Sequence, residues 1–420
     1  MGFQQGLSGL NASSKNLEVI GNNVANANTF GAKASRAEFA DMYAAAMNGS
    51  GANKIGIGVN LAAVTQQFSQ GSITTTESSL DVAINGAGFF QLSDNGTTVY
   101  SRNGQFQVNK DGYIVSNGGL KLMGYKADGT GTIQPGQAVP LQLPTAGIDP
   151  AATKNITLEM NLDSRAATTL PATTPQINLT DAKTYNNATS LTVYDAKGQD
   201  VALTYYFQKA GTDQWNVYVT ANGTSLAVDG AGDPAPVTTM QFPTNGGNPT
   251  APVGAVTLDI PATTNAAGAE TLAIAGVQLN LGHATQYGAG FGVTDLKQDG
   301  YAPGQLSGLS IEDNGIVMAT YSNGQSKPAG QMELANFRNT QGLKPLGGNN
   351  WARSYESGDP ILGTPSEGNM GVLQSGALEE SNVDLTAELV NMMTAQRTYQ
   401  ANAQTIKTQD QVLQTLVNLR

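Results

Sequence analysis

The sequence predicts a mainly β protein with α-helical termini, built from several nested domains. Three observations indicate this fold class: both ends show a helical spacing of apolar residues, the interior alternates short strand-like runs with tight turns, and charged residues are few. Charged side chains make up 13% of the 420 residues, whereas Gly alone occurs 50 times. Gly together with Asn and Thr is typical of short strands joined by turns. A chain of this length can hold two or three domains, each with its own core.

The N-terminal segment has the spacing of a coiled-coil helix. Apolar or small residues recur at alternating steps of four and three, which is the pattern of a heptad seam. The seam residues are Phe3, Leu7, Leu10, Ser14, Leu17, Gly21 and Val24. The seam ends in a run of Asn residues, Asn22, Asn23, Asn26 and Asn28. Because Asn tolerates the left-handed conformation and bonds to nearby backbone, we expect this run to end the helix.

The C-terminal segment repeats the pattern over a greater length. Its seam residues are Leu385, Leu389, Met392, Gln396, Tyr399, Ala403, Ile406, Asp410, Leu413 and Val417. Ser381 or Asp384 can cap the start of this helix, and neither Gly nor Pro interrupts residues 385–419. At about 1.5 Å per residue, the helix is a rod on the order of 50 Å long. The two ends of the chain are therefore expected to pair as coiled-coil-like helices.

Neither seam is uniformly apolar. Ser14 and Gly21 interrupt the first, and Gln396 and Asp410 interrupt the second. Further apolar residues lie beside both seams, so one pair of helices would leave apolar surface in water. We therefore expect helices from other copies of the chain around the pair, with an ordinary helical hairpin within one chain as the alternative. The predicted assembly interface comprises Phe3, Leu7, Leu10, Leu17, Val24, Asn22, Asn23, Asn26, Leu385, Leu389, Met392, Tyr399, Ile406, Leu413 and Val417.

Between the helical ends, the sequence alternates strands and turns. Leu80, Val82 and Ile84 occupy alternate positions before Asn85-Gly86, and a second apolar run follows at residues 89–92. Asn-Gly and Asp-Gly are strong hairpin signals because both central positions need positive φ. Further pairs of this kind are Asn95-Gly96, Asn103-Gly104, Asp111-Gly112 and Asn117-Gly118. Other predicted strands are 191–194, 201–207, 215–220, 311–314, 315–321 and 331–337, with a short helix at 36–47 and an extended stretch at 59–68.

The predicted domains are nested from the ends of the chain inward. A terminal helical assembly domain surrounds a connector, the connector surrounds an inner β-domain, and an outer β-domain is inserted in the inner one. In that order, the expected ranges are 1–28 with 381–420, 29–70 with 365–380, 71–145 with 286–364, and 146–285. Both β-domains are expected to be barrel-like or sandwich-like.

Composition excludes several classes of function. The net charge of −11 argues against nucleic acid as a partner, because affinity for phosphates rests on Lys and Arg. No apolar run approaches the roughly 20 residues that span a bilayer, so we expect no membrane insertion. The N-terminus lacks the basic head and apolar stretch of a signal peptide. Cys is absent, which excludes disulfides, thiolate metal ligands and a Cys nucleophile.

The sequence also lacks a recognisable catalytic or cofactor-binding motif. His283 is the single His, so a catalytic triad or imidazole metal site would depend on it alone, and a surface His is the better interpretation. Gly86-Ala87-Gly88 follows a strand but lacks the third Gly of a dinucleotide loop. The Asp-Gly pairs lack the carboxylate spacing of a calcium loop. We therefore expect no enzymatic activity, no cofactor and no metal.

Both ends of the chain resemble a known protein family. GNNVANANT at 21–29, preceded by GLSGLNASSKNLEVI at 6–20, resembles the signature of bacterial flagellar rod, hook and hook-associated axial proteins. Residues 376–420 resemble the C-terminus of the same family throughout. Within the family, SLDVAINGAGFFQL at 79–92 and QMELANFRNTQGL at 331–343 are similar to the hook subunit, as is the presence of a large inserted domain. In Gly31-Ala32-Lys33, relatives usually carry an aromatic residue before Lys, which leaves the local packing open.

The resemblance implies a structural subunit that polymerises into the flagellar hook, a flexible curved tube that acts as a universal joint and transmits motor torque from rod to filament. It implies export through the flagellar type III apparatus without a cleaved signal peptide, and an extracellular place in the flagellum next to the basal body. The implied partners are further copies of the chain, the hook cap protein, the distal rod protein, the hook–filament junction protein and the export apparatus.

Two alternatives stay open from the sequence. The first is a distal rod protein of the basal body, which would form a straight and rigid polymer. The second is a secreted glycan-binding or hydrolytic β-protein, because two carboxylates can meet in space as a glycosidase pair. A sugar-binding platform could be formed by Tyr205, Tyr206, Trp215 and Tyr218. Their strand spacing is more typical of core residues and cross-strand pairs.

Overall fold

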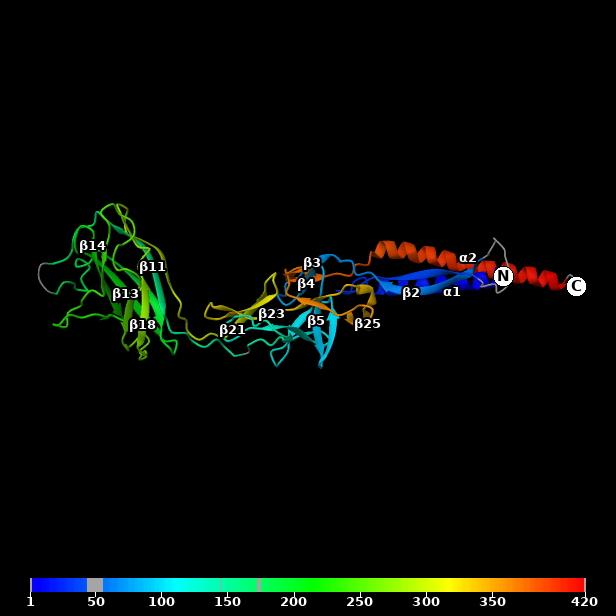
Figure 1. The fold of residues 1–420 in the computed structure, drawn as a ribbon, viewed down its shortest axis with the longest axis horizontal. Coiled ribbons are helices and arrows are strands. Elements are labelled where there is room, and N and C mark those ends of the chain that lie inside the picture. The colour runs from blue at the N-terminus through cyan, green and yellow to red at the C-terminus, as the bar shows by residue number, and fades with distance from the viewer. Residues whose placement is uncertain (1, 44–55, 145, 172–174, 419–420) are drawn as a thin grey trace. The chain divides into compact units, whose positions relative to one another are not determined.

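The computed structural model describes residues 2–43, 56–144, 146–171 and 175–418. The chain forms two compact units (Figure 1). The first unit consists of Met1–Thr145, Gly308–Thr320 and Ser326–Arg420, and the second of Ala146–Ser307 and Tyr321–Gln325. The chain therefore leaves the first unit, builds the second and returns.

The two ends of the chain form long helices, α1 at Gly2–Ala25 and α2 at Leu385–Asn418, which pack against each other. Small residues of α1 face α2. A Cβ atom added at Gly6 would lie 3.0 Å from Cγ1 of Ile406, and one added at Gly9 would lie 2.8 Å from Nδ2 of Asn402. The absence of side chains at these two positions therefore permits the close approach of the helices.

The helix ends follow the predicted capping chemistry. The Asp384 carboxylate accepts hydrogen bonds from the backbone N–H groups of Thr386 and Ala387, at 2.9 and 3.1 Å, and so caps the start of α2. At the end of α1, the amide of Asn26 donates to the backbone oxygen of Asn22 at 2.9 Å. Asp384 is thus the cap of the two candidates, and the Asn run ends α1 as expected.

A β-hairpin follows α1 and packs on it. Strands β1, Ser35–Tyr43, and β2, Gly56–Gln66, are antiparallel. The extended stretch predicted at 59–68 is confirmed for residues 59–66. The short helix predicted at 36–47 is wrong for residues 36–43, and residues 44–47 lie outside the described residues. Ala, Glu and Met favour a helix locally, but pairing along the whole of β2 and contact with α1 outweigh this weak preference.

Segments from both halves of the chain interleave in the first unit. Its main sheet has the strand order β21-β22-β23-β9-β5-β6-β26-β25, with β7, β8, β10, β24 and β27 attached at the sides. Two further ladders, β4–β28 and β3–β29, also join an early to a late segment. The bounds are β3 Ile73–Thr75, β4 Val82–Asn85, β5 Phe89–Asp94, β6 Thr97–Ser101, β7 Phe106–Val108, β8 Ile114–Ser116, β9 Lys121–Lys126, β10 Val139–Pro140, β21 Leu306–Ile311, β22 Ile316–Tyr321, β23 Ser326–Met332, β24 Leu334–Asn336, η1 Thr340–Gly342, β25 Lys344–Gly347, β26 Asn350–Ala352, β27 Ile361–Gly363, β28 Val372–Ser375 and β29 Ala377–Glu379.

Hairpin chemistry and aromatic packing hold this unit together. Asn95 and Gly96 have φ of 49° and 98° and join β5 to β6 in a two-residue turn, with Asp94 paired to Thr97. Besides its aliphatic core, the unit has an aromatic cluster with edge-to-face contacts, made of Phe68, Phe89, Tyr100, Phe337 and Trp351.

The second unit is a sandwich of two five-stranded sheets that share one hydrophobic core. In β11, every second side chain from Ile156 to Leu162 is buried, which is the pattern of a strand with one face on a core. The strands are β11 Asn155–Asp163, β12 Asn187–Tyr194, β13 Asp200–Lys209, β14 Gln214–Ala221, β15 Thr224–Ser225, β16 Thr238–Gln241, β17 Val256–Ile260, β18 Ile274–Asn280, β19 Thr285–Tyr287 and β20 Gly292–Gln298. The mainly β fold with helical termini is confirmed. The barrel-like alternative is not confirmed. Each sheet in the described residues is open, because its strand order does not return to the first strand.

Candidate assembly surface and its junction

The described apolar residues of the predicted interface are exposed or half-buried in the single chain. Six side chains are exposed by 37 to 54%: Phe3, Leu7, Leu385, Leu389, Tyr399 and Leu413. Five are half-buried: Leu10, Leu17, Val24, Met392 and Ile406. The side chain of Val417 lies outside the described residues. Val390, Met393 and Val412 add further exposed apolar surface to α2. The helical pair therefore presents an apolar surface that its own chain does not cover.

On α1, residues other than the apolar seam are the ones buried within the chain, whereas the seam residue Ile406 of α2 lies against Gly6. Gly6, Ser13 and Ile20, seven residues apart, are buried in α1, and Ala395 is buried in α2. The heptad spacing of Gly6, Ser13 and Ile20 was the available signal, and it was missed because the seam was chosen by apolar size, which Gly6 and Ser13 lack. The residues of α1 that are buried within the chain thus form a stripe directly beside the apolar seam.

Asn23, from the Asn run at the end of α1, is hydrogen-bonded to the start of β1. Its amide nitrogen donates to the Ser35 backbone oxygen, and its amide oxygen accepts from the Ser35 backbone N–H, both at 2.8 Å. Asn23 is buried, Asn26 is half-buried and Asn22 is exposed. The two bonds fix the direction in which β1 leaves α1.

Three buried charged side chains meet where the helices join the β-structure. Glu379 ends β29, shortly before α2, and its carboxylate lies 2.6 Å from Lys33 Nζ and 3.2 Å from the Arg102 guanidinium. The side chains of Lys33 and Glu379 are fully buried, and that of Arg102 is 6% exposed. We call these three residues the junction triad. It connects the segment after α1, the loop after β6 and the segment before α2.

Backbone groups supply further hydrogen bonds to the junction triad, although the buried Nε of Arg102 has no partner among the described residues. Lys33 Nζ donates to the Ser69 backbone oxygen at 2.8 Å, and the backbone N–H of Gly71 donates to Glu379 at 2.9 Å. The Arg102 guanidinium donates to the Gly86 backbone oxygen at 2.8 Å. Such partners are required because a buried charge without them costs several kcal/mol.

Burial determines the electrostatics of the two cations. It lowers the pKa of Lys33, and the nearby Glu379 carboxylate opposes that change. Burial lowers the pKa of Arg102 in the same way, again opposed by Glu379. The Glu379 carboxylate thus pairs with both buried cations, and it favours the charged form of each.

The packing around Gly31-Ala32-Lys33 follows from the junction triad. The Gly31 N–H donates to the Glu379 backbone oxygen at 2.8 Å, and Ala32 is buried. Gly31 has a φ of +70°, and a Cβ added there would lie 2.6 Å from the backbone nitrogen of Asn103. Sequence reasoning noticed this tripeptide but missed Lys33 itself, since its partners lie far away in the chain.

The described residues contain no group of three or more His, Cys, Asp or Glu that could hold a metal ion. His283 is exposed, as expected. Tyr205, Trp215 and Tyr218 are fully buried in the second unit, and Tyr206 pairs with Tyr218 across two strands. The aromatic side chains thus form core and cross-strand pairs rather than an open platform. None of the described helices has the length and apolar character needed to cross a membrane.

Comparison with known proteins identifies the family. Four family models match the chain: flagella basal body rod protein at 3–33, the D1 domain of flagellar hook protein FlgE/F/G at 83–196, the D2 domain of flagellar basal body protein FlaE at 161–301, and the C-terminal part of flagellar basal body rod protein FlgEFG at 374–419. The flagellar hook protein FlgE of Escherichia coli K12 is 44% identical over the full length of both chains. The chain belongs to the flagellar hook protein FlgE family.

Other FlgE proteins support this assignment. FlgE of Salmonella typhimurium LT2 is 42% identical over the full length of both chains, and FlgE of Rhizobium meliloti is 33% identical over all of this chain and 98% of its own. The crystal structure of Helicobacter pylori FlgE2 is similar in fold, with a TM-score of 0.52 over 73% of this chain and 100% of that chain at 16% identity. Full-length similarity to FlgE favours the hook over the rod, and places the chain among the structural proteins of the flagellum.

Proposed function

We propose that this chain polymerises into the flagellar hook, a curved tube outside the cell that acts as a universal joint between rod and filament. The observation that carries the proposal is the 44% identity to a flagellar hook protein over the full length of both chains. The exposed apolar residues on α1 and α2 support it, because apolar surface of this kind is normally covered by a partner.

In the proposed polymer, the terminal helices of neighbouring copies bundle into the inner wall of the tube. The apolar interface residues named in the sequence analysis lie on this wall and exclude water between copies. The β-structure outside the wall makes polar contacts that slide as the tube bends. Its low content of charged residues favours this role, since strong ion pairs between copies would resist sliding.

We further propose the nested division predicted above: terminal helices, connector, inner β-domain and an inserted outer β-domain. The separation of residues 146–307 as a compact unit supports the last of these. The proposed partners are the hook cap protein during assembly, the distal rod protein below and the hook–filament junction protein above. The chain is proposed to reach them through the flagellar type III export apparatus without a cleaved signal peptide.

Electron microscopy of the purified protein tests the proposal. Under conditions that favour polymerisation, the chain is expected to form curved tubes whose curvature changes with salt and temperature. Straight, short and rigid polymers would favour a rod protein instead. A protein that stays monomeric at high concentration, with its helices ordered, would contradict assembly through the terminal helices. Restoration of swimming in cells that lack their own hook subunit is the matching test in vivo.

A further inference from the structure

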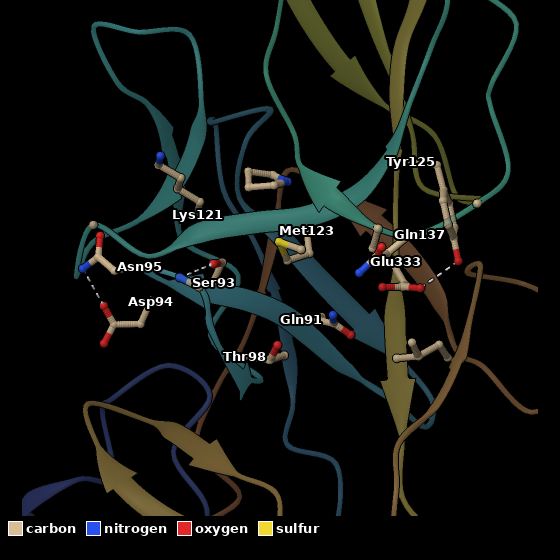
Figure 2. Close-up of a pocket in the computed structure, with 16 residues that line it drawn as sticks. Gln91, Ser93, Asp94, Asn95, Thr98, Lys121, Met123, Tyr125, Gln137 and Glu333 are labelled. Atoms are coloured by element: carbon tan, nitrogen blue, oxygen red, sulfur yellow. Dashed lines mark hydrogen bonds between the residues drawn. The ribbon is translucent and has the colours of Figure 1, made fainter.

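A polar cavity of about 770 Å³ lies on the main sheet of the first unit (Figure 2). Strands β5, β6 and β9, the segment at 136–140, Glu333 and Leu362 line it. Figure 2 shows Gln91, Tyr125 and Glu333 towards one end of the cavity, and Lys121, Asp94 and Asn95 towards the other. We call it the Glu333 cavity. Neither the hook assignment nor the terminal helices explain its chemistry.

Two buried oxygen atoms in this cavity lack a hydrogen-bond donor. Glu333 is 1% exposed; its Oε1 accepts the Tyr125 hydroxyl at 2.7 Å, but its Oε2 has no partner among the described residues. Gln91 is 7% exposed, and its Oε1 also lacks a partner there. Most buried polar side-chain atoms are hydrogen-bonded, so two such acceptors in one cavity call for an explanation.

The strand register brings the two acceptors together. Strand β5 pairs with β24 in an antiparallel ladder in which Phe90 lies opposite Leu334. Gln91 and Glu333 are the next residues beyond the end of this ladder, and both line the cavity. Residues opposite each other in such a ladder have Cβ atoms about 5 Å apart. Both oxygens without a donor thus belong to residues that line the same cavity.

No cation of the cavity wall supplies the missing donors. Lys121 is the only Lys or Arg among the lining residues, and its Nζ lies 4.2 Å from the centre of the Tyr113 ring. The other acidic residue of the lining, Asp94, accepts a hydrogen bond from Asn95 at 3.2 Å. The charge of Glu333 thus has no counter-charge within the wall.

We propose that the Glu333 cavity binds a guanidinium or ammonium group carried on an apolar stem. A guanidinium offers several N–H donors in one plane and pairs strongly with carboxylate and amide oxygens. Apolar groups of Met123, Pro140 and Leu362 line the same cavity and can pack against the stem. An arginine or lysine side chain has this chemistry, and so does a free alkylguanidine or alkylamine.

Two sources can supply the cation. One is a small molecule in solution, and the other is a basic side chain of a neighbouring copy, since the chain carries exposed residues such as Arg338 and Arg397. The second source rests on the proposed polymerisation, whereas the cavity itself is a property of the single chain.

Titration calorimetry of the monomer with n-butylguanidinium tests the site. Saturable binding is expected, and the neutral isostere n-butylurea is expected to bind at least tenfold more weakly. Loss of a charge-assisted hydrogen bond in Glu333→Gln should weaken binding by about tenfold or more. Asp94→Asn is the matched control, because it removes the same charge from the other end of the cavity, and it should change the affinity by no more than about twofold.

A second variant separates binding from folding. Gln91→Met removes an oxygen that receives no hydrogen bond within the described residues, and it keeps a side chain of similar length. The fold should therefore persist, whereas binding should weaken severalfold. Circular dichroism melting curves of all variants check that each is folded. Absence of butylguanidinium binding by the wild-type monomer would overturn the proposal. Equal weakening by Glu333→Gln and Asp94→Asn would also overturn it, because the effect would then be general electrostatics.

A polymer experiment distinguishes the two sources. If a neighbouring copy supplies the cation, polymers of Glu333→Gln should dissociate at a lower urea concentration than polymers of the wild type or of Asp94→Asn. Equal dissociation, together with butylguanidinium binding by the monomer, assigns the site to a free cation. Failure of the wild type to polymerise would count against the proposed function and leave the monomer titration as a valid test of the site.

Discussion

At the scale of single residues, the junction triad places three charged side chains in the interior of the protein. Lys33 and Arg102 are both buried, and Glu379 is the single carboxylate between them. Removal of one partner from a buried ion pair costs more than the pair contributes, because the remaining charge stays in a medium of low dielectric. Glu379 therefore stabilises two cations at once, and its loss affects both.

We predict that Glu379→Gln lowers the free energy of unfolding of the first unit by about 3–5 kcal/mol. Urea denaturation of the monomer, followed by circular dichroism, measures the change. Glu380→Gln is the control: it removes the same charge one residue later, at an exposed site, and should change stability by less than about 0.5 kcal/mol. Similar stability of the two variants would show that the triad contributes no net electrostatic stabilisation.

A pH-dependent prediction concerns Glu333. Burial raises the pKa of its carboxyl group, and the hydrogen bond from Tyr125 opposes this. The folded state therefore holds the proton more tightly than the unfolded state, so this contribution to stability is present below the unfolded pKa and is lost as the pH rises through the folded pKa. Glu333→Gln should melt at a higher temperature than the wild type at pH 7, with the difference much reduced at pH 4. A variant less stable than the wild type at pH 7 would contradict this assignment.

Among the features of single residues, the sequence could predict those that depend on neighbouring residues in the chain. Asp384 as a cap and the Asn95-Gly96 turn depend on a few consecutive residues, and both are confirmed. The Lys33–Glu379 pair joins residues 346 positions apart. One sequence contains no signal for such a pairing, because a buried and an exposed Lys look the same until the fold brings a carboxylate to one of them.

At the scale of elements, the helices and the first hairpin differ in how well they could be predicted. The terminal helices repeat one pattern over many turns, so their presence and type followed from periodicity. Strand β1 is different: its residues have moderate helix propensity, and its conformation is set by β2 and α1. The stripe of α1 that is buried within the chain was missed because Gly6 and Ser13 allow close packing through their small size, which a count of apolar residues does not detect.

We predict that Leu413→Asp prevents polymerisation and leaves the stability of the monomer nearly unchanged. Leu413 is 54% exposed in the single chain, so a carboxylate there stays in water until another copy covers it. Burial of an unpaired carboxylate in the assembled wall would cost several kcal/mol per copy. Sedimentation and electron microscopy measure the polymer. The exposed Gln411→Asp adds the same charge on the opposite side of α2 and should still assemble. Normal tubes from Leu413→Asp would remove this residue from the interface.

At the scale of the whole molecule, the main segment of the second unit begins and ends in two chain segments that lie side by side. Ile148 and Gly304 exchange backbone hydrogen bonds of 2.8 and 3.2 Å, and Ala151 bridges Tyr301. The start and end of the intervening segment are therefore adjacent, which is the arrangement expected of an inserted domain. The nested plan of four parts stays a prediction, which rests on the return of similar hairpins late in the sequence, whereas the strand order of each sheet could not be predicted.

We predict that a chain with residues 149–303 replaced by a short Gly-Ser linker still folds its first unit and polymerises. The hydrophobic core of the second unit lies within the deleted segment, and the terminal helices are unchanged. Outer contacts between copies would be lost, so the tubes should be straighter. Thermal melting tests the fold, and electron microscopy tests curvature. A folded first unit that fails to polymerise would make the inserted segment an assembly element.

The pairing of α1 with α2 also has a consequence for the time order in which the molecule forms. These helices are the first and last described elements, and the β4–β28 and β3–β29 ladders close in the same late region. Contacts between residues this far apart in sequence form slowly, and they cannot form before the last residues are available. A chain delivered from its N-terminus onward therefore acquires its helical pair only on completion. A chain that ends before Glu379 lacks both that carboxylate and α2, and under the assembly proposed above such an incomplete copy is expected not to enter the polymer.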